Sequence, residues 1–304
     1  MTHLPPPPDG SATTTAIPDP VTPAGSTSAN PPSAKRKRHR RSVAGKRAER
    51  VLLSWTWLVI VWLCAPIAVM ILFGFNDTQG RYNTVWNGFT FKWYPRLFDI
   101  PALSDALINS LLLALLTMLI AGAIGTMLGL ALGRYRFRGQ GATNLVMFAV
   151  ISSPELVMGA SLLSFFVSVQ FPLGFWTILI SHVMFSVSFV AVVVRARVLT
   201  LDRNLEEAAR DLGANAFTTF WLVTFPMIFP AVLSGGLLAF ALSIDDFVIT
   251  NFNAGTTMTF PLWIWGATRV GLPPQVNVMG TLIFAIGLII AIVNAVNARR
   301  RAKQ

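Results

Sequence analysis

The sequence predicts an all-α fold: a polytopic helical bundle in a membrane, with six transmembrane helices and both termini in the cytoplasm. Hydrophobic residues make up 54% of the chain and charged residues 12%, whereas charged residues approach about a quarter of a soluble domain. Long apolar runs recur along the sequence, and basic residues gather on one side of them. Composition, run length and charge distribution therefore agree on the fold class.

Each apolar run is long enough for a helix to cross a hydrocarbon core of about 30 Å. Because backbone polar groups must be satisfied internally in lipid, these runs are expected to be helices. The expected spans are residues 51–73, 108–132, 145–169, 172–194, 228–249 and 276–296.

Two of these spans carry features that predict local structure. In the second, Ala121, Gly125, Gly129 and Gly133 recur at four-residue spacing, and such a row of small residues lets another helix approach closely. In the third, Pro154 lies near the middle, where it should kink the helix.

The distribution of basic residues predicts the orientation. With the N-terminus in the cytoplasm, 20 of the 24 Lys and Arg residues fall on the cytoplasmic side of the spans, as the positive-inside rule requires. The net charge of +11 therefore needs no nucleic-acid partner. Both termini, and the polar loop between the fourth and fifth spans, are expected to be cytoplasmic.

Residues 1–50 are predicted to be a tail outside the folded domain, which is expected to cover residues 51–304. Residues 1–34 are rich in Pro, Ser and Thr and lack apolar periodicity, which favours disorder. A basic cluster follows directly before the first span, where membrane lipid is the expected partner. The run that begins at Val51 lacks a small-residue cleavage site, so it is predicted to be an anchor rather than a signal peptide.

Several kinds of chemistry are not expected of this chain. Its single cysteine, Cys64, cannot form an intramolecular disulfide, and its three histidines show no metal-ligand spacing, so no metal site is predicted. His182 lies within a span and is expected to be a hydrogen-bonded packing residue rather than a proton relay. No phosphate-binding loop of the form GxxxxGK[ST] occurs, so energy must come from a partner or a gradient.

The polar loop 195–226 carries the most specific motif. Glu-Ala-Ala is followed after three residues by Gly, and after nine more by Val, one residue and Phe-Pro; these positions are Glu207, Ala208, Ala209, Gly213, Val223, Phe225 and Pro226. The pattern resembles the EAA loop of bacterial ABC importer permeases, with Phe225 where Leu is usual. A short helix 204–212, a turn at Gly213, a second short helix and a Pro-bounded start of the next span are expected. An ordinary cytoplasmic loop helix is the alternative.

The region after the fifth span narrows the resemblance. Residues 260–277 predict a short amphipathic helix followed by a Pro-Pro turn into the last span. Together with Asp245-Asp246-Phe247-Val248 and Arg269-Val270-Gly271, this region is similar to the second permease subunit of spermidine/putrescine ABC importers. The likeness covers residues 51–298, with the type-1 transmembrane core at about 105–297. The long tail, Phe225, and Gln275 where an acidic residue is common, depart from that pattern.

The resemblance implies a transport subunit of the bacterial cytoplasmic membrane rather than an enzyme. It implies a second homologous permease subunit, two copies of a soluble ATPase that holds ATP and Mg²⁺, and an extracytoplasmic substrate-binding protein; no cofactor is expected on this chain. The ATPase is expected to contact Glu206, Glu207, Ala208 and Gly213. The start of a helix favours acidic residues through its dipole, so capping could explain one of the two glutamates.

Three acidic residues lie within apolar spans: Glu155, Asp245 and Asp246. Charges at mid-bilayer cost about 2.5–3.5 kcal/mol and usually face a bundle interior or a polar path. The spans hold no Lys or Arg that would neutralise them, so we expect them to attract a polycation along its route. On a continuous helix the two aspartates would point about 100° apart. The alternatives are that Asp246 caps or hydrogen-bonds a neighbouring helix and that Glu155 binds backbone groups freed by Pro154.

The cargo has open alternatives. The same fold imports ferric ion, thiamine or oxyanions in related systems, although three unneutralised acids disfavour an oxyanion. A gradient-driven secondary carrier is a more remote alternative, because it would need neither an EAA-like loop nor an ATPase. Trp263 and Trp265 offer cation–π faces, but residues of the interfacial aromatic belt are the simpler interpretation.

Overall fold

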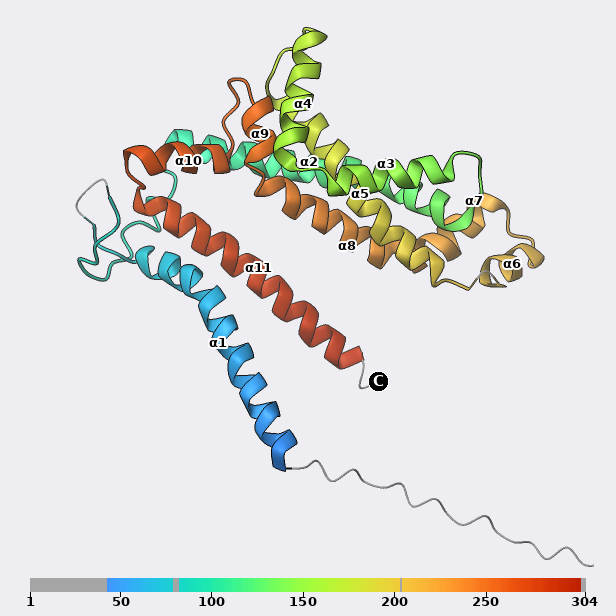
Figure 1. Ribbon diagram of the computed structural model, residues 1–304, viewed down its shortest axis with the longest axis horizontal. Helices are drawn as coiled ribbons and strands as arrows, with labels where there is room; N and C mark the ends of the chain where they lie inside the picture. The colour runs from blue at the N-terminus through green and yellow to red at the C-terminus, as the bar shows by residue number, and fades with distance from the viewer. Residues whose placement is uncertain (1–42, 79–81, 203, 302–304) are drawn as a thin grey trace, which may run out of the picture. The chain divides into compact units, whose positions relative to one another are not determined.

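The computed structural model describes residues 43–78, 82–202 and 204–301 (Figure 1). The chain divides into two compact units, Met1–Trp57 and Leu58–Gln304. Within the first, the structure describes the beginning of helix α1 (Val43–Phe73). That helix begins eight residues before the apolar run at Val51, within the expected tail. The disorder predicted for residues 1–34 and most of the basic cluster lie outside the described residues.

Helices form nearly all of the regular structure in the described part of the chain, which contains no strand. An isolated antiparallel bridge joins Asn76 to Phe89. After α1 the long helices are α2 (Pro101–Arg134), α5 (Phe175–Leu199), α8 (Phe225–Ile244) and α11 (Pro274–Arg301). The shorter ones are α3 (Gln140–Ser152), α4 (Glu155–Ser168), α6 (Asn204–Asp211), α7 (Ala216–Thr219), the π-helical turn η1 (Phe220–Thr224), α9 (Val248–Asn253) and α10 (Phe260–Val270).

Among the described residues, four helices are long and apolar enough to cross a membrane. They are Glu49–Phe73, Pro101–Arg134, Phe175–Leu199 and Ala216–Ile244. The pair α3 and α4 makes a fifth if it counts as one broken span, and α11 contributes a shorter apolar stretch, Pro274–Ile289. A multi-pass helical membrane protein is therefore confirmed, while the sixth span stays a prediction.

The third expected span is broken rather than kinked at Pro154. Helices α3 and α4 meet at an angle of 108°. Ser153 has φ −69° and ψ 134°, and Pro154 has φ −61° and ψ 128°, so both residues are extended. A proline disfavours the helical region for the residue before it and removes one N–H donor. Two consecutive extended residues turn the expected kink into a sharp change of direction.

Helices α2, α5 and α8 pack against one another and form the core of the second unit (Figure 1). The row of small residues on α2 faces α5. A Cβ atom at Gly125 would lie 2.6 Å from Cβ of Val190, and one at Gly129 would lie 2.7 Å from the carbonyl oxygen of Ala191. Such distances leave no room for a side chain, so the close helix approach predicted from the four-residue spacing is confirmed.

The fifth span begins earlier than expected. Helices α7, η1 and α8 form one helical span from Ala216 to Ile244, so the loop contains no separate second helix. Within η1 the register shifts, and the N–H of Phe225 bonds to the carbonyl of Phe220. Pro226 follows directly in the first turn of α8, where the preceding π turn has already changed the helical hydrogen-bond pattern. Pro226 therefore does not separate the loop from the span, contrary to expectation.

The region between the fifth and last spans agrees with its prediction. Helix α10 covers Phe260–Val270, and α11 begins at Pro274 after a short turn. The backbone N–H of Phe260 donates to Oγ of Ser110 on α2 at 2.9 Å, and the side chain of Asn109 donates to the carbonyl of Met258 at 2.9 Å. These two contacts attach the start of α10 to the N-terminal half of α2.

Candidate functional site

The two adjacent aspartates lie in a helix break, not on a continuous helix. Helix α8 ends at Ile244, Asp245 is its C-cap, and α9 begins at Val248. The expectation of a span over 228–249, with the two side chains about 100° apart around one axis, is therefore wrong. Because the backbone leaves the helix at this point, neighbouring residues can face different surroundings.

The carboxylate of Asp246 is engaged by its own chain. Its Oδ2 accepts hydrogen bonds from the backbone N–H and the hydroxyl of Thr250, both at 2.7 Å, and its Oδ1 accepts a longer one from the N–H of Ile249 at 3.4 Å. Nε2 of His182 lies 3.2 Å from Oδ2, and the Asp246 side chain is 8% exposed. Asp246 thus satisfies the first turn of α9, a buried and internal role.

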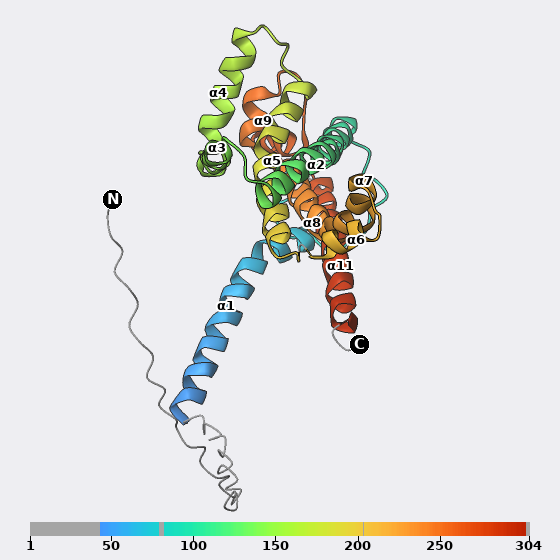
Figure 2. The ribbon, with the colours of Figure 1, turned by 90° about the vertical axis from the view of Figure 1, so that its right-hand side faces the viewer.

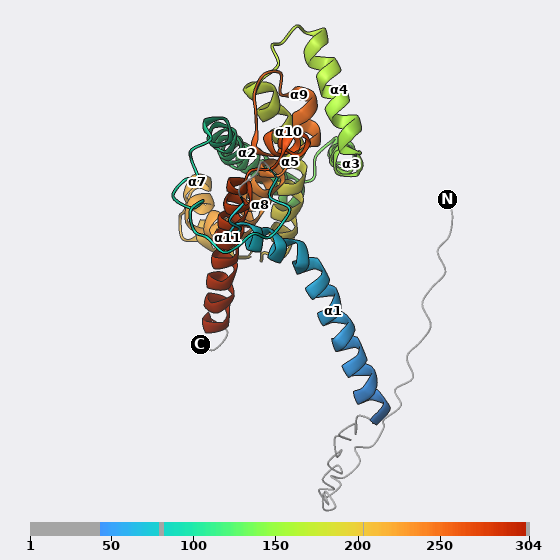
Figure 3. The same ribbon diagram turned by 90° about the vertical axis from the view of Figure 1, so that its left-hand side faces the viewer.

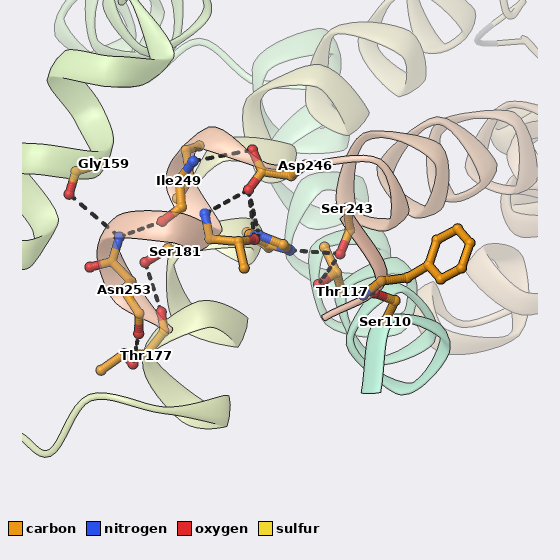
Figure 4. A network of polar contacts seen from close by, with 12 residues as sticks. Ser110, Thr117, Gly159, Thr177, Ser181, Ser243, Asp246, Ile249 and Asn253 are labelled. Atoms are coloured by element: carbon orange, nitrogen blue, oxygen red, sulfur yellow. Dashed lines mark hydrogen bonds and ion pairs between the residues drawn. The ribbon is translucent and has the colours of Figure 1, made fainter. Parts of the chain in front are cut away.

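His182 on α5 connects this carboxylate to two further helices. Its Nε2 lies 2.9 Å from the hydroxyl of Thr250, and its Nδ1 lies 2.7 Å from that of Ser243 on α8. Ser243 in turn donates to Oγ1 of Thr117 on α2 at 3.3 Å (Figure 4). His182 is a hydrogen-bonded packing residue, as predicted.

The same network continues to α4 through Asn253. The side-chain Nδ2 of Asn253 donates to the carbonyl of Ile249 at 2.9 Å and to that of Gly159 at 3.4 Å, and the backbone carbonyl of Asn253 accepts from the hydroxyl of Thr177 at 2.7 Å. A Cβ at Gly159 would lie 2.8 Å from the Phe252 ring, so α4 and α9 lie in close contact (Figure 3). Contacts from α2, α4 and α5 therefore hold the break after α8 in place.

Asp245 has different surroundings. It lines a pocket of about 420 Å³ whose other walls are largely apolar. Phe247 and Trp265 stand in this wall with ring centroids 5.2 Å apart, and the Arg269 guanidinium lies 5.5 Å from the centre of the Trp265 ring. Trp263 instead lines a larger pocket of about 750 Å³ with Trp93 and Gln275. Of the two tryptophans considered from the sequence, Trp265 is the one beside an aspartate.

Glu155 does not belong to the hydrogen-bond network around the two aspartates. It is the first residue of α4, directly after Pro154, and is exposed. Among the described residues, no hydrogen bond or ion pair joins it to either aspartate. A carboxylate in the first turn is favoured by the helix dipole. Helix α4 packs against α9, which places Glu155 on an element adjacent to the aspartate break.

The loop helix α6 ends as the motif predicts. Gly213 has φ +89°, its N–H bonds to the carbonyl of Arg210 at 2.8 Å, and the N–H of Ala214 bonds to that of Ala209 at 3.0 Å. This pair of bonds is a Schellman motif with glycine in the left-handed position. Asn215 then caps the next helix by accepting from the N–H of Thr218 at 2.8 Å. The sharp turn predicted at Gly213 is confirmed.

The two loop glutamates differ in the same way as the aspartates. Glu207 and Ala208 are exposed. Oε1 of Glu206 accepts from Nη2 of Arg134 at 2.7 Å and from the hydroxyl of Thr224 at 2.8 Å. The sequence suggested capping for one glutamate and did not identify these partners, because Arg134 lies 72 positions away. Among the described residues, no group of three or more metal-ligating side chains could hold an ion.

Comparison with known proteins provides evidence on the family of this chain that is independent of the structure. The family described as "Binding-protein-dependent transport system inner membrane component" matches residues 125–303. The chain is 36% identical over 248 residues to the spermidine/putrescine transport system permease protein PotC of Haemophilus influenzae, covering 81% of this chain and 96% of that protein. It is 37% identical over 249 residues to the putrescine transport system permease protein PotI of Escherichia coli, covering 79% and 86%.

A solved structure shares the fold. It is a bacterial ABC transporter involved in the import of the acidic polysaccharide alginate, with a TM-score of 0.62 at 16% identity. The match covers 84% of this chain and 97% of that chain. At this level of identity the likeness concerns the fold alone.

Proposed function

This chain belongs to the inner membrane components of binding-protein-dependent transport systems, and from this we propose that it forms half of the translocation pathway of an ATP-driven polyamine importer. The relatives that cover most of its length are named as spermidine/putrescine and putrescine permeases. The cargo and the pathway residues follow from combining those names with the geometry of the aspartate break.

The proposed arrangement has six transmembrane helices with both termini in the cytoplasm. The 20-to-4 distribution of Lys and Arg supports this orientation through the positive-inside rule. It places loop helix α6 on the side where a soluble ATPase acts. The aspartate break, at the far end of α8 from that loop, then lies in the outer half of the membrane.

The proposed substrate contact is Asp245. Of the two adjacent aspartates, Asp246 already receives internal hydrogen bonds on both oxygens, so a substrate would have to displace the first turn of α9 to reach it. Asp245 lines a pocket beside Phe247 and Trp265, and a carboxylate next to aromatic faces suits an alkylammonium group. This pocket is the observation that carries the cargo assignment. Glu155 is proposed as a further acidic group along the path.

The proposed assembly contains a second homologous permease, two copies of an ATPase that holds ATP and Mg²⁺, and an external binding protein. In this proposal the ATPase contacts Glu207 and Ala208 of α6 and the turn at Gly213 that follows the helix. Closure of the ATPases would bring the two α6 helices of the assembly together and open the path outward. In this proposal the chain supplies no covalent chemistry and no cofactor of its own.

Uptake of labelled spermidine and putrescine into proteoliposomes that contain the full complex tests this function. We expect uptake to need ATP and the binding protein. Asp245→Asn should lower uptake per assembled complex at least about tenfold, because a desolvated charge contact contributes a few kcal/mol. Thr268→Ser, a conservative change in the wall of the same pocket, is the matched control and should leave uptake within about twofold.

Three results would contradict parts of the proposal. Uptake that continues without ATP would indicate a gradient-driven carrier. Normal polyamine uptake in Asp245→Asn would remove Asp245 from the path. Absence of polyamine uptake in the wild-type complex, with transport of ferric ion, thiamine or an oxyanion, would retain the importer and change its cargo.

A further inference from the structure

Helix α6 is held to the membrane helices mainly by its side chains. It has eight residues, all of them described, and none of them is buried. It packs against α7 (Figure 2) and against η1. An exposed helix of two turns is barely stable by itself, so its position depends on the contacts that fix it. Among these contacts, Glu206 accepts side-chain hydrogen bonds from α2 and from η1.

Glu206 joins three elements at one oxygen atom. Its Oε1 accepts from Arg134, the last residue of α2, and from Thr224, the last residue of η1. The Arg134 and Glu206 side chains are 11% and 21% exposed, and Thr224 is 7% exposed. Partial burial weakens solvent screening, so this charge-assisted contact is stronger than an ion pair on the surface.

The elements that Glu206 joins connect α6 to the core of the second unit. Helix α2 is packed along α5 and α8, and its cytoplasmic end is Arg134. The turn η1 leads without interruption into α8, at whose far end lies the Asp245–Phe247 break. A π turn is a local departure from regular helical geometry and is common at functional sites.

We propose that Glu206 is a positioning residue that transmits displacement of α6 to α2 and α8 through Arg134 and Thr224. This inference rests on the proposed function. The proposal gives the two glutamates of the loop different roles: Glu207 is open to the ATPase, whereas Glu206 faces the permease itself. Loss of Glu206 should therefore leave ATPase binding intact and lower the amount of substrate moved per ATP hydrolysed.

The test uses the complete complex in proteoliposomes, with ATP hydrolysis and substrate uptake measured on the same samples. In Glu206→Ala and in Arg134→Met, the ATPase should still co-purify at the wild-type ratio. Substrate transported per ATP should fall about fivefold or more, the range of typical coupling between sites. The double variant should be no worse than either single variant, because both remove the same contact.

Thr224 supplies a milder pair of variants. Thr224→Val keeps the shape of the side chain and removes the hydroxyl donor, and it should lower transport per ATP in the same direction. Thr224→Ser keeps the hydroxyl and should retain the wild-type ratio. If the proteins with Glu206→Ala or Arg134→Met are not produced in the membrane, a double variant that exchanges the two charges, Arg134→Glu with Glu206→Arg, replaces them. Assembly of this charge-exchanged variant with wild-type transport per ATP supports the proposal.

Other outcomes would overturn it. Unchanged transport per ATP in Glu206→Ala would show that the contact carries no signal. Loss of ATPase co-purification in Glu206→Ala, with Arg134→Met normal, would show that Glu206 contacts the ATPase directly. An exchanged pair that assembles but stays uncoupled would also contradict the proposal. Failure of the proposed function is distinct, because the wild-type complex itself would then take up no polyamine or would take it up without ATP.

Discussion

The chain contains two pairs of adjacent acidic residues, and in both pairs the two carboxylates have different surroundings. At the aspartate break, Asp246 is bound by His182 and the first turn of α9 while Asp245 lines a pocket. In the loop helix, Glu206 is bound by Arg134 and Thr224 while the next residue is exposed. In each pair one carboxylate holds the fold and the other faces outward.

The two pairs reach this division by different means. Glu206 and its neighbour lie on one helix, whose geometry turns successive side chains by about 100°. The aspartates lie where helix α8 has ended, so their separation comes from the break in the backbone. Adjacent residues of one type therefore do not share a role. Which of the two is internal depends on the hydrogen bonds that neighbouring elements make with it.

The largest expected effect concerns the internal aspartate. Asp246→Ala removes the acceptor for two backbone N–H groups and for the Thr250 hydroxyl, and it leaves His182 facing an empty position. Unsatisfied buried groups and a lost helix cap together cost about 2–4 kcal/mol. We expect a lower free energy of unfolding in detergent and lower abundance in the membrane.

Asp245→Ala is the matched control for that measurement. Its free energy of unfolding should stay within about 0.5 kcal/mol of the wild type, because Asp245 lines a pocket and takes no part in the hydrogen bonds among Asp246, His182 and α9. Equal destabilisation by the two variants would mean that the aspartates act together structurally, and the comparison between them would fail.

A smaller effect is expected at the turn that ends α6. Gly213→Val places a β-branched residue at φ +89°, which costs about 1–2 kcal/mol, although a Cβ there would meet no atom within 4 Å. The strained turn should shift α6 and lower affinity for the ATPase about tenfold in a co-purification titration. Gly213→Asn should retain most of the affinity, because asparagine tolerates the left-handed region.

Gly139 provides a control for backbone strain. It has φ +96°, precedes α3, and also leaves its Cβ position open. Gly139→Val therefore introduces comparable strain in a different loop. Unchanged ATPase affinity in that variant would locate the effect at α6. Equal losses in both variants would show that the defect comes from general destabilisation rather than from the polar loop 195–226.

The sequence predicted those parts of the molecule that depend on local pattern. Apolar run length located the helices of the core, the four-residue spacing of glycines located the contact between α2 and α5, and the motif located the turn at Gly213. These features follow from residues close together in the chain. The fold class could therefore be read without knowing any long-range contact.

The sequence did not predict where helices break or which acidic residue is internal. Pro154 indicated a kink, but the size of the break depends on the extended conformation of Ser153 as well. No proline or glycine marks the end of α8 at Ile244, where the hydrogen bonds of Asp246 to α9 and to His182 stabilise the break. The contact of Glu206 with Arg134 spans 72 positions and has no local pattern.

The smallest expected effect concerns the exposed glutamate of the loop. Glu207→Gln keeps the size of the side chain and removes its charge. Exposed charge pairs contribute little, so affinity for the ATPase should fall only about twofold to fivefold, and more at low salt than at high salt because salt screens such contacts. The free energy of unfolding of Glu207→Gln should not change.

Glu206→Gln should show the reverse, with a lower free energy of unfolding and unchanged affinity for the ATPase, because the Glu206 carboxylate is internal. If instead Glu207→Gln alone destabilises the permease, or its effect on affinity does not depend on salt, the loop pair does not divide as the aspartates do.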